Sequence, residues 1–262
     1  GAGVVIDKDI TIDLGGYTYS FTDGVGSTGT ESNGFQILKD NTVEIKNGTL
    51  NVNEADKAEF YILIQNYANL TLTDVTLDGT NLDKWSATDG DSYVLSNNSG
   101  NVELRGETNI IANDEGDKAF AFDVCKYGSY AAPVVTVNTT GTINGNIEVT
   151  EEIADNLTIY SGTYTVNVDV YCADGFTTVK NADGTYNFGV VGLGDTGGTN
   201  PRYYVNHYVN VDPLSMVGSA SDFINKEGNK AYVDGDYPWT SLSGINADKD
   251  GKITAINVSK GE

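Results

Sequence analysis

The acidic residues of one loop are the first candidates for catalysis. The densest group is Asp78, Asp83, Asp89 and Asp91, with Lys84 beside them. A polysaccharide lyase would need a carboxylate cluster that holds calcium and a cationic base next to it, for which Lys84 and the later Arg105 are available. A glycoside hydrolase would instead need two carboxylates at a set separation across a cleft. Because loops of an acidic protein are acidic in any case, an enzyme that uses Asp78, Asp89 and Asp91 is only the alternative prediction.

A second acidic run resembles the front half of a calcium-binding loop. Asn246, Asp248 and Asp250 alternate along the chain and are followed by Gly251. Calcium takes 6–8 oxygen ligands, and such a loop normally closes with a bidentate carboxylate at its twelfth position. That position holds Asn257, so a polar turn between two strands is the other interpretation. The sequence predicts no resident cofactor, and calcium at the three alternating residues is the alternative.

Aromatic residues are candidates for contact with carbohydrate. Tyr17, Tyr19 and Phe21 alternate, so we expect all three on one side of a strand. On an outer face they would form a strip for sugar rings, and on an inner face they would cover one end of the core. The same two alternatives apply to the aromatic residues near the carboxyl terminus. The predicted binding residues are Tyr17, Tyr19, Tyr203, Tyr204 and Trp239.

Several familiar sites are excluded. Gly192-x-Gly194-x-x-Gly197 matches a dinucleotide fingerprint, but Gly198-Thr199-Asn200-Pro201 cannot open the helix that would hold the pyrophosphate. The single histidine, His207, excludes a zinc site of several histidines and offers no Ser–His–Asp arrangement. Cys125 and Cys172 could form a disulfide or remain as buried thiols, and the sequence leaves both alternatives open.

Charge and hydropathy restrict the partners. The chain has 15 Lys and Arg against 37 Asp and Glu, a net charge of −22. Nucleic acid is excluded because phosphate binding needs clustered cations. Membrane insertion is excluded because no segment approaches the roughly 20 apolar residues of a spanning helix. Glycans or other surface proteins remain as partners.

The elements that carry these residues are short strands in a repeating pattern. Thr, Val, Ile and Tyr suit pleated surfaces, and the 31 Gly suit the turns between them. A strand, a Gly or Asp turn and a second strand recur, and the aligned residues are Ile12, Ile45, Leu72, Leu104, Val137 and Ile159, spaced by 22 to 33 residues. This irregular repeat predicts a solenoid, in which Ile12, Leu14, Ile45, Leu72, Leu104 and Ile159 point inward. An antiparallel sandwich is the alternative.

Three segments carry a resemblance to a known fold family. Ile10–Thr18 looks like the first coil of right-handed parallel β-helix proteins of the pectate-lyase-like class. The segments Tyr160–Phe176 and Asn181–Tyr186 are similar to the ends of β-helices in large secreted or wall-attached bacterial proteins. The resemblance covers roughly residues 4–190 and implies an extracellular or cell-surface location. It says little about activity, because this fold class includes lyases, hydrolases and adhesins.

Together these observations predict an all-β chain with two parts. Residues 1–190 are expected to form a right-handed parallel β-helix. The pattern breaks into glycine near residue 190, so residues 191–262 are expected to form a carboxyl-terminal cap or a small β-rich module. The predicted function is that of a non-catalytic, adhesin-like or structural module that binds carbohydrate, and the alternative is a polysaccharide-active lyase or glycoside hydrolase.

Overall fold

The computed structural model divides into two compact units, Gly1–Val166 and Asn167–Glu262. It describes residues 1–28, 30–83, 90–114, 116–173, 176–181, 183–191, 205–206, 245–247 and 253–256. The division falls earlier in the chain than the boundary predicted near residue 190. Most of residues 191–262, the predicted cap or module, lies outside the described residues, so that part of the prediction stays a prediction.

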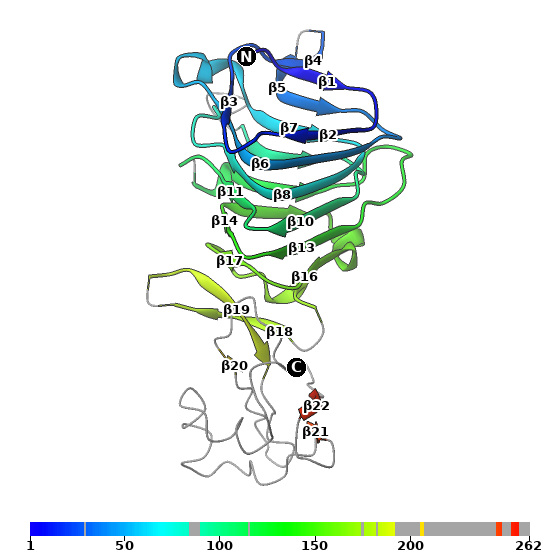
Figure 1. The fold of residues 1–262 in the computed structure, drawn as a ribbon, viewed down its shortest axis with the longest axis vertical. Helices are drawn as coiled ribbons and strands as arrows, with labels where there is room; N and C mark the ends of the chain where they lie inside the picture. The colour runs from blue at the N-terminus through cyan, green and yellow to red at the C-terminus, as the bar shows by residue number, and fades with distance from the viewer. Residues whose placement is uncertain are drawn as a thin grey trace. The chain divides into compact units, whose positions relative to one another are not determined.

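The first unit is a β-solenoid of stacked parallel strands (Figure 1). Its first sheet contains, in spatial order, β1 (Val4–Ile6), β5 (Thr30–Ile37), β7 (Ile62–Asn66), β9 (Ser92–Asn97), β12 (Ala119–Val124) and β15 (Asn146–Val149). All neighbours in this series pair in parallel. A short strand, β4 (Val25–Ser27), pairs with β5 in the antiparallel sense.

The second sheet of this unit has two arms that meet at a corner. The first arm stacks β2 (Ile10–Asp13), the start of β6 (Thr42–Val52), the start of β8 (Asn69–Asp78), β10 (Val102–Gly106), β13 (Val135–Thr139) and β16 (Leu157–Ile159). The second arm stacks β3 (Thr18–Phe21), the ends of β6 and β8, β11 (Asn109–Ile111), β14 (Thr142–Asn144) and β17 (Thr163–Tyr164). Each coil therefore runs from the first sheet through both arms, which rules out the antiparallel sandwich.

The core consists of columns of apolar side chains in register. Ile45, Leu72, Leu104 and Ile159 are at most 1% exposed, which confirms their predicted inward orientation. Ile12 and Leu14 are only half-buried. They lie on the first coil of the stack, where β2 is covered by β6 on one side only.

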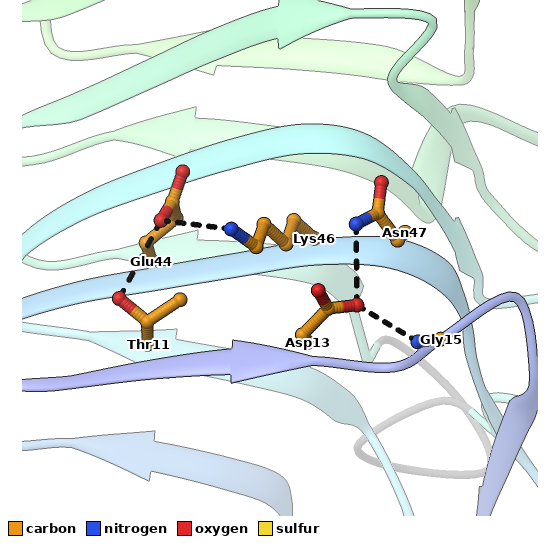
Figure 2. A network of polar contacts seen from close by, with 6 residues as sticks. All are labelled: Thr11, Asp13, Gly15, Glu44, Lys46 and Asn47. Atoms are coloured by element: carbon orange, nitrogen blue, oxygen red, sulfur yellow. Dashed lines mark hydrogen bonds and ion pairs between the residues drawn. The ribbon is translucent and has the colours of Figure 1, made fainter.

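The corner of the second sheet uses residues with left-handed backbone. Asn47, Asp74 and Gly106 have φ of 57°, 53° and 57°. Asn47 and Asp74 lie inside long strands, so Asn47-Gly48 is a corner rather than a hairpin turn. Figure 2 shows that Asp13 supports the corner: its carboxylate accepts hydrogen bonds from the Gly15 N–H (2.9 Å) and from Asn47 Nδ2 (3.1 Å). These bonds hold the pKa of Asp13 below its usual value, the Gly15 N–H having the largest effect.

A pair of buried asparagines supports the opposite corner, where the first sheet ends. Asn66 Nδ2 donates to Asn97 Oδ1 (2.9 Å) and to the Ala68 carbonyl (3.0 Å), and Asn66 Oδ1 accepts from the Ala68 N–H (3.1 Å). Both asparagines are at most 1% exposed. Their amides supply the partners that turning backbone needs inside an apolar core.

Short 3-10 helices connect some strands, namely η1 (Glu54–Glu59), η2 (Gly116–Lys118) and η3 (Glu151–Asn156). The second unit contains η4 (Asp169–Tyr171), the antiparallel strands β18 (Phe176–Lys180), β19 (Tyr186–Val191) and β20 (Val205–Asn206), and the antiparallel pair β21 (Ile245–Ala247) and β22 (Ile253–Ile256). Among the described residues, no helix has the length and apolar character that a membrane span requires.

Candidate functional site

The predicted aromatic strip at the amino terminus does not exist as a strip. Tyr17 precedes β3 and is 78% exposed, whereas Phe21 is fully buried. Tyr19 lies against Phe21, with ring centroids 5.1 Å apart, and donates its hydroxyl to the Ala2 carbonyl (2.8 Å). The prediction that all three rings share one side is therefore wrong, because the alternation begins only where β3 begins. Tyr203, Tyr204 and Trp239 lie outside the described residues.

The structure describes two of the predicted catalytic carboxylates, Asp78 and Asp91, and each has a partner within the protein. Asp78 accepts hydrogen bonds from the Thr80 N–H (3.1 Å) and hydroxyl (2.7 Å), which shapes the turn after β8. Asp91 forms an ion pair with Lys118 (3.1 Å). Asp89 and Lys84 lie outside the described residues.

Arg105 does not stack over this loop. It is in register with Thr73 on the first arm, whereas Asp78 pairs with Ile111 on the second arm, beyond the corner. The guanidinium instead forms an ion pair with Glu103 on its own strand. The basic group that the lyase alternative needs beside its acids is therefore not supplied by Arg105.

The predicted calcium site lies mostly outside the described residues, and the two cysteines are not bonded to each other. Asn246 lies on β21, and Asp248 and Asp250 are outside the described residues, so calcium there stays a prediction. Elsewhere in the described chain, no group of three or more His, Cys, Asp or Glu side chains could hold a metal ion. Cys125 and Cys172 are free thiols rather than a disulfide.

A pocket that the sequence did not reveal lies where the first sheet ends and the chain turns toward the second. Its volume is about 360 Å³, and its lining includes Lys39, Asp40, Tyr67, Asn69, Asn101 and Tyr130. These residues follow β5, β7, β9 and β12, so successive coils contribute to one site. This volume is at the small end of the range of about 300–1,000 Å³ for ligand pockets.

Two tyrosines, Tyr67 and Tyr130, line this site, which we call the tyrosine pocket, and Tyr127 packs against both of their rings. The ring centroid of Tyr67 lies 5.4 Å from that of Tyr127 and 6.3 Å from that of Tyr130, at interplanar angles of 80° and 74°. Tyr127 and Tyr130 are 5.6 Å apart at 70°. The rings therefore meet nearly at right angles. Burial, and then the neighbouring Tyr127 and Tyr130, raise the pKa of Tyr67, so its hydroxyl stays protonated.

Polar groups complete the tyrosine pocket. Asn101 Nδ2 donates to Asn69 Oδ1 (2.9 Å), and Asn101 Oδ1 accepts from the Val134 N–H (2.8 Å). Asn69 Nδ2 makes no hydrogen bond to any described residue, and Asn69 is exposed. Lys39 forms an ion pair with Asp40 (3.5 Å), and its Nζ lies 4.9 Å from the centroid of the Tyr130 ring. The site thus offers ring faces and hydrogen-bond donors, with its one cation already paired.

The loop between β12 and β13 carries Tyr130, which lines the pocket, and Tyr127, which packs against it. It is held at its start, where the Tyr127 N–H donates to Ser99 Oγ (2.7 Å), and near its end, where Asn156 Nδ2 donates to the Pro133 carbonyl (2.6 Å). A turn joins the tyrosines, with the Tyr130 N–H donating to the Tyr127 carbonyl (3.0 Å). The available sequence signal was a Tyr-x-x-Tyr phrase in a long inter-strand loop, but only the coil register shows that Tyr67 lies beside it.

An open groove runs along the outer face of the first arm and differs in character. It measures about 610 Å³ and is lined by residues that include Thr11, Glu44, Thr71 and Arg105. Glu44 lies 3.8 Å from Lys46 and 3.5 Å from the Thr11 hydroxyl (Figure 2). The lining drawn from the described residues contains no aromatic ring. Glu44 pairs with Lys46 and Arg105 pairs with Glu103 on an exposed surface, where such pairs contribute little to the free energy of folding.

The outer face of the first sheet contains a buried carboxyl, Asp123. It is 6% exposed, accepts a hydrogen bond from the Asn97 N–H and is in register with Glu148 on β15. Burial raises the pKa of Asp123 to about 7, the Asn97 N–H opposes this shift, and Glu148 adds to it. Glu148 in turn accepts a hydrogen bond from the Tyr93 hydroxyl (2.7 Å). Because Asp123 is enclosed, we assign this pair a role in stability rather than in catalysis.

The tyrosine pocket is thus the arrangement in the described chain best suited to hold a small polar ligand with an apolar face. No protein-family model, curated protein or solved structure matches this chain.

Proposed function

We propose that this protein is a non-catalytic module of an extracellular or cell-surface protein, and that its tyrosine pocket binds carbohydrate. The location follows from the resemblance of its coils to pectate-lyase-like β-helices of secreted bacterial proteins. The β-solenoid supports the structural half of the proposal, because a stack of coils is a rigid scaffold that displays loops from several repeats together.

One observation carries the binding half of the proposal. The rings of Tyr67 and Tyr130, which belong to two loops, line a pocket that also offers the amides of Asn69 and Asn101. Sugar rings have apolar C–H faces and hydroxyl edges, and tyrosine supplies an apolar face with a polar tip. Tyrosine also loses little side-chain entropy on binding, so it is an efficient contact residue. Core packing does not account for Tyr67 and Tyr130, which are both partly exposed.

The test is a glycan-array screen of the whole chain with and without calcium, in which every hit is retested for product release by mass spectrometry. We expect binding without turnover and without dependence on calcium. Tyr130→Ala should reduce the affinity for the hits at least about tenfold, as expected when a central aromatic contact is removed. Tyr160→Ala is the matched control, because Tyr160 is a 47% exposed tyrosine of the same unit that does not line the pocket.

The outcomes separate the alternatives. Product release would replace the binding module by a polysaccharide-active enzyme and direct attention to the loop that contains Asp78, Asp89 and Asp91. Equal losses for Tyr130→Ala and Tyr160→Ala would place the glycan elsewhere on the surface. A complete absence of hits would reject carbohydrate as the ligand.

A further inference from the structure

We infer that the tyrosine pocket takes a single uncharged pyranose unit at the end of a glycan, rather than the interior of a flat polysaccharide chain. This inference rests on the proposed function and adds the class of ligand. It follows from the angles between the rings, from the hydrogen-bonding capacity of the lining and from the local charge.

The ring angles exclude a flat platform. A planar polysaccharide surface is matched by aromatic rings that lie side by side in one plane, so that successive sugars can stack on successive rings. Here Tyr67 is inclined by 74° to Tyr130 and by 80° to Tyr127. A chain that stacked on one ring would collide with the next, whereas a single sugar can place its face on one ring and its edge against another. Edge-to-face contacts of this kind are also favourable for the rings themselves.

The volume agrees with a short ligand. About 360 Å³ is available, and one wall of the pocket is formed by Tyr130 of the long loop, whose ring contacts that of Tyr67. Tyr130 is held there by Lys39, so this wall belongs to the folded scaffold. A pocket closed by walls from separate coils accommodates a terminal unit more readily than a continuous chain.

The lining offers a hydrogen-bond donor that no described residue uses, the side-chain amide of Asn69. Asn69 Oδ1 and Asn101 Oδ1 already accept hydrogen bonds from Asn101 Nδ2 and the Val134 N–H, whereas Asn69 Nδ2 has no partner among the described residues. An amide nitrogen provides two N–H donors. Sugar hydroxyl and ring oxygens are matching acceptors for this amide.

The charge of the site argues against an acidic sugar. Lys39 is paired with Asp40 at 3.5 Å and lies over the Tyr130 ring, so no unpaired cation faces the pocket in the described structure. A carboxylate would therefore have to share Lys39 with Asp40, which also lines the pocket and would repel it. The net charge of −22 adds a long-range repulsion that salt screens only in part.

The experiment is calorimetric titration of the whole chain with neutral gluco-, manno-, xylo- and chito-oligosaccharides, from the monosaccharide to the hexasaccharide. For the series that binds, we expect the Kd of the disaccharide to lie within about threefold of that of the hexasaccharide. The methyl glycosides of glucose and glucuronic acid test the charge, and we expect the uronate to bind at least about tenfold more weakly. Tyr67→Ala should weaken every member of the series equally, and Tyr160→Ala should weaken none.

The two proposals fail in different ways. An affinity that rises tenfold or more from disaccharide to hexasaccharide would show a chain-binding groove, which overturns the inference and leaves the proposed function intact. Equal or tighter binding of the uronate would overturn the uncharged class alone. If no oligosaccharide binds and the glycan array is also silent, the proposed function itself is rejected.

Discussion

Lys39 Nζ lies 4.9 Å from the centroid of the Tyr130 ring, although the strands that precede these residues, β5 and β12, are separated in the sheet by β7 and β9. The loop after β12 therefore folds back across two intervening coils to reach the loop after β5. This contact joins Lys39 and Tyr130, a charged and an aromatic residue of the pocket lining.

Replacing Lys39 by Met should weaken glycan binding modestly. A cation over an exposed aromatic ring contributes about 0.5–1 kcal/mol to holding that ring in place, so freeing Tyr130 should raise Kd by at most about two- to fivefold, which calorimetry can measure. Lys39→Arg should retain the affinity because arginine also stacks on tyrosine. Lys46→Met is the control, since Lys46 pairs with Glu44 on the outer face of the first arm. Tighter binding by Lys39→Met would instead show that the lysine competes with the ligand for the ring.

Gly106→Ala should destabilise the solenoid more than Gly116→Ala. Both glycines have left-handed backbone, with φ of 57° and 63°, which costs about 1–2 kcal/mol for a residue with a Cβ. At Gly106 the added Cβ would also lie 2.1 Å from Asp74 Oδ1, whereas at Gly116 nothing lies within 4 Å. Asp74 Oδ1 accepts from the Glu107 N–H (2.8 Å), so it cannot move away without losing that bond. Urea denaturation should show that Gly106→Ala lowers the free energy of unfolding by about 0.5–1.5 kcal/mol more than Gly116→Ala does. Equal losses in the two variants would show that the contact with Asp74 costs nothing.

Asn66→Ala should lower the free energy of unfolding strongly. The substitution leaves the Ala68 N–H and Asn97 Oδ1 without their partner in a buried region, at a cost of about 1–3 kcal/mol for each group. Chemical denaturation measures the loss. Asn146→Ala is the control, because Asn146 Nδ2 donates to the Gly116 carbonyl (2.9 Å) at an exposed position and should cost less than about 1 kcal/mol. A comparable loss in both variants would refute a special role for the buried pair.

Asp123 should make the stability depend on pH. Its folded pKa is raised to about 7, mainly by burial, whereas the pKa of an unfolded aspartate is about 3.9. The native state therefore binds the proton more tightly, and this contribution to stability is fully present below about pH 4 and is lost as the pH rises through about 7.

Asp123→Asn should remove that dependence while keeping an oxygen for the Asn97 N–H. We expect the free energy of unfolding of the variant, relative to the parent protein, to be higher at pH 8 than at pH 5. Glu148 is the neighbouring titratable group in register with Asp123, so Glu148→Gln serves as the control for the part of the pH dependence that comes from Glu148. A difference between variant and parent that is the same at both pH values would show that Asp123 does not titrate in this range.

The repeat could be predicted from the sequence because inward positions of a strand must be apolar wherever coils stack. Ile45, Leu72, Leu104 and Ile159 were therefore identifiable without coordinates, and the structure buries all four. The outward aromatic residues could not be assigned in the same way. Tyr17 and Tyr19 alternate in the sequence, yet the strand begins between them, so one is exposed and the other covers the end of the core.

The sequence by itself determined that this chain is acidic, β-rich and built from stacked coils, because composition and alternation are local properties that every coil repeats. Only the tertiary structure decided which loops share a corner. Tyr67 and Tyr130 belong to different coils, and their distance depends on the parallel register of β7, β9 and β12 and on the fold-back of one loop. Such contacts between distant segments arise from the three-dimensional packing of the coils, which local alternation in the chain does not record.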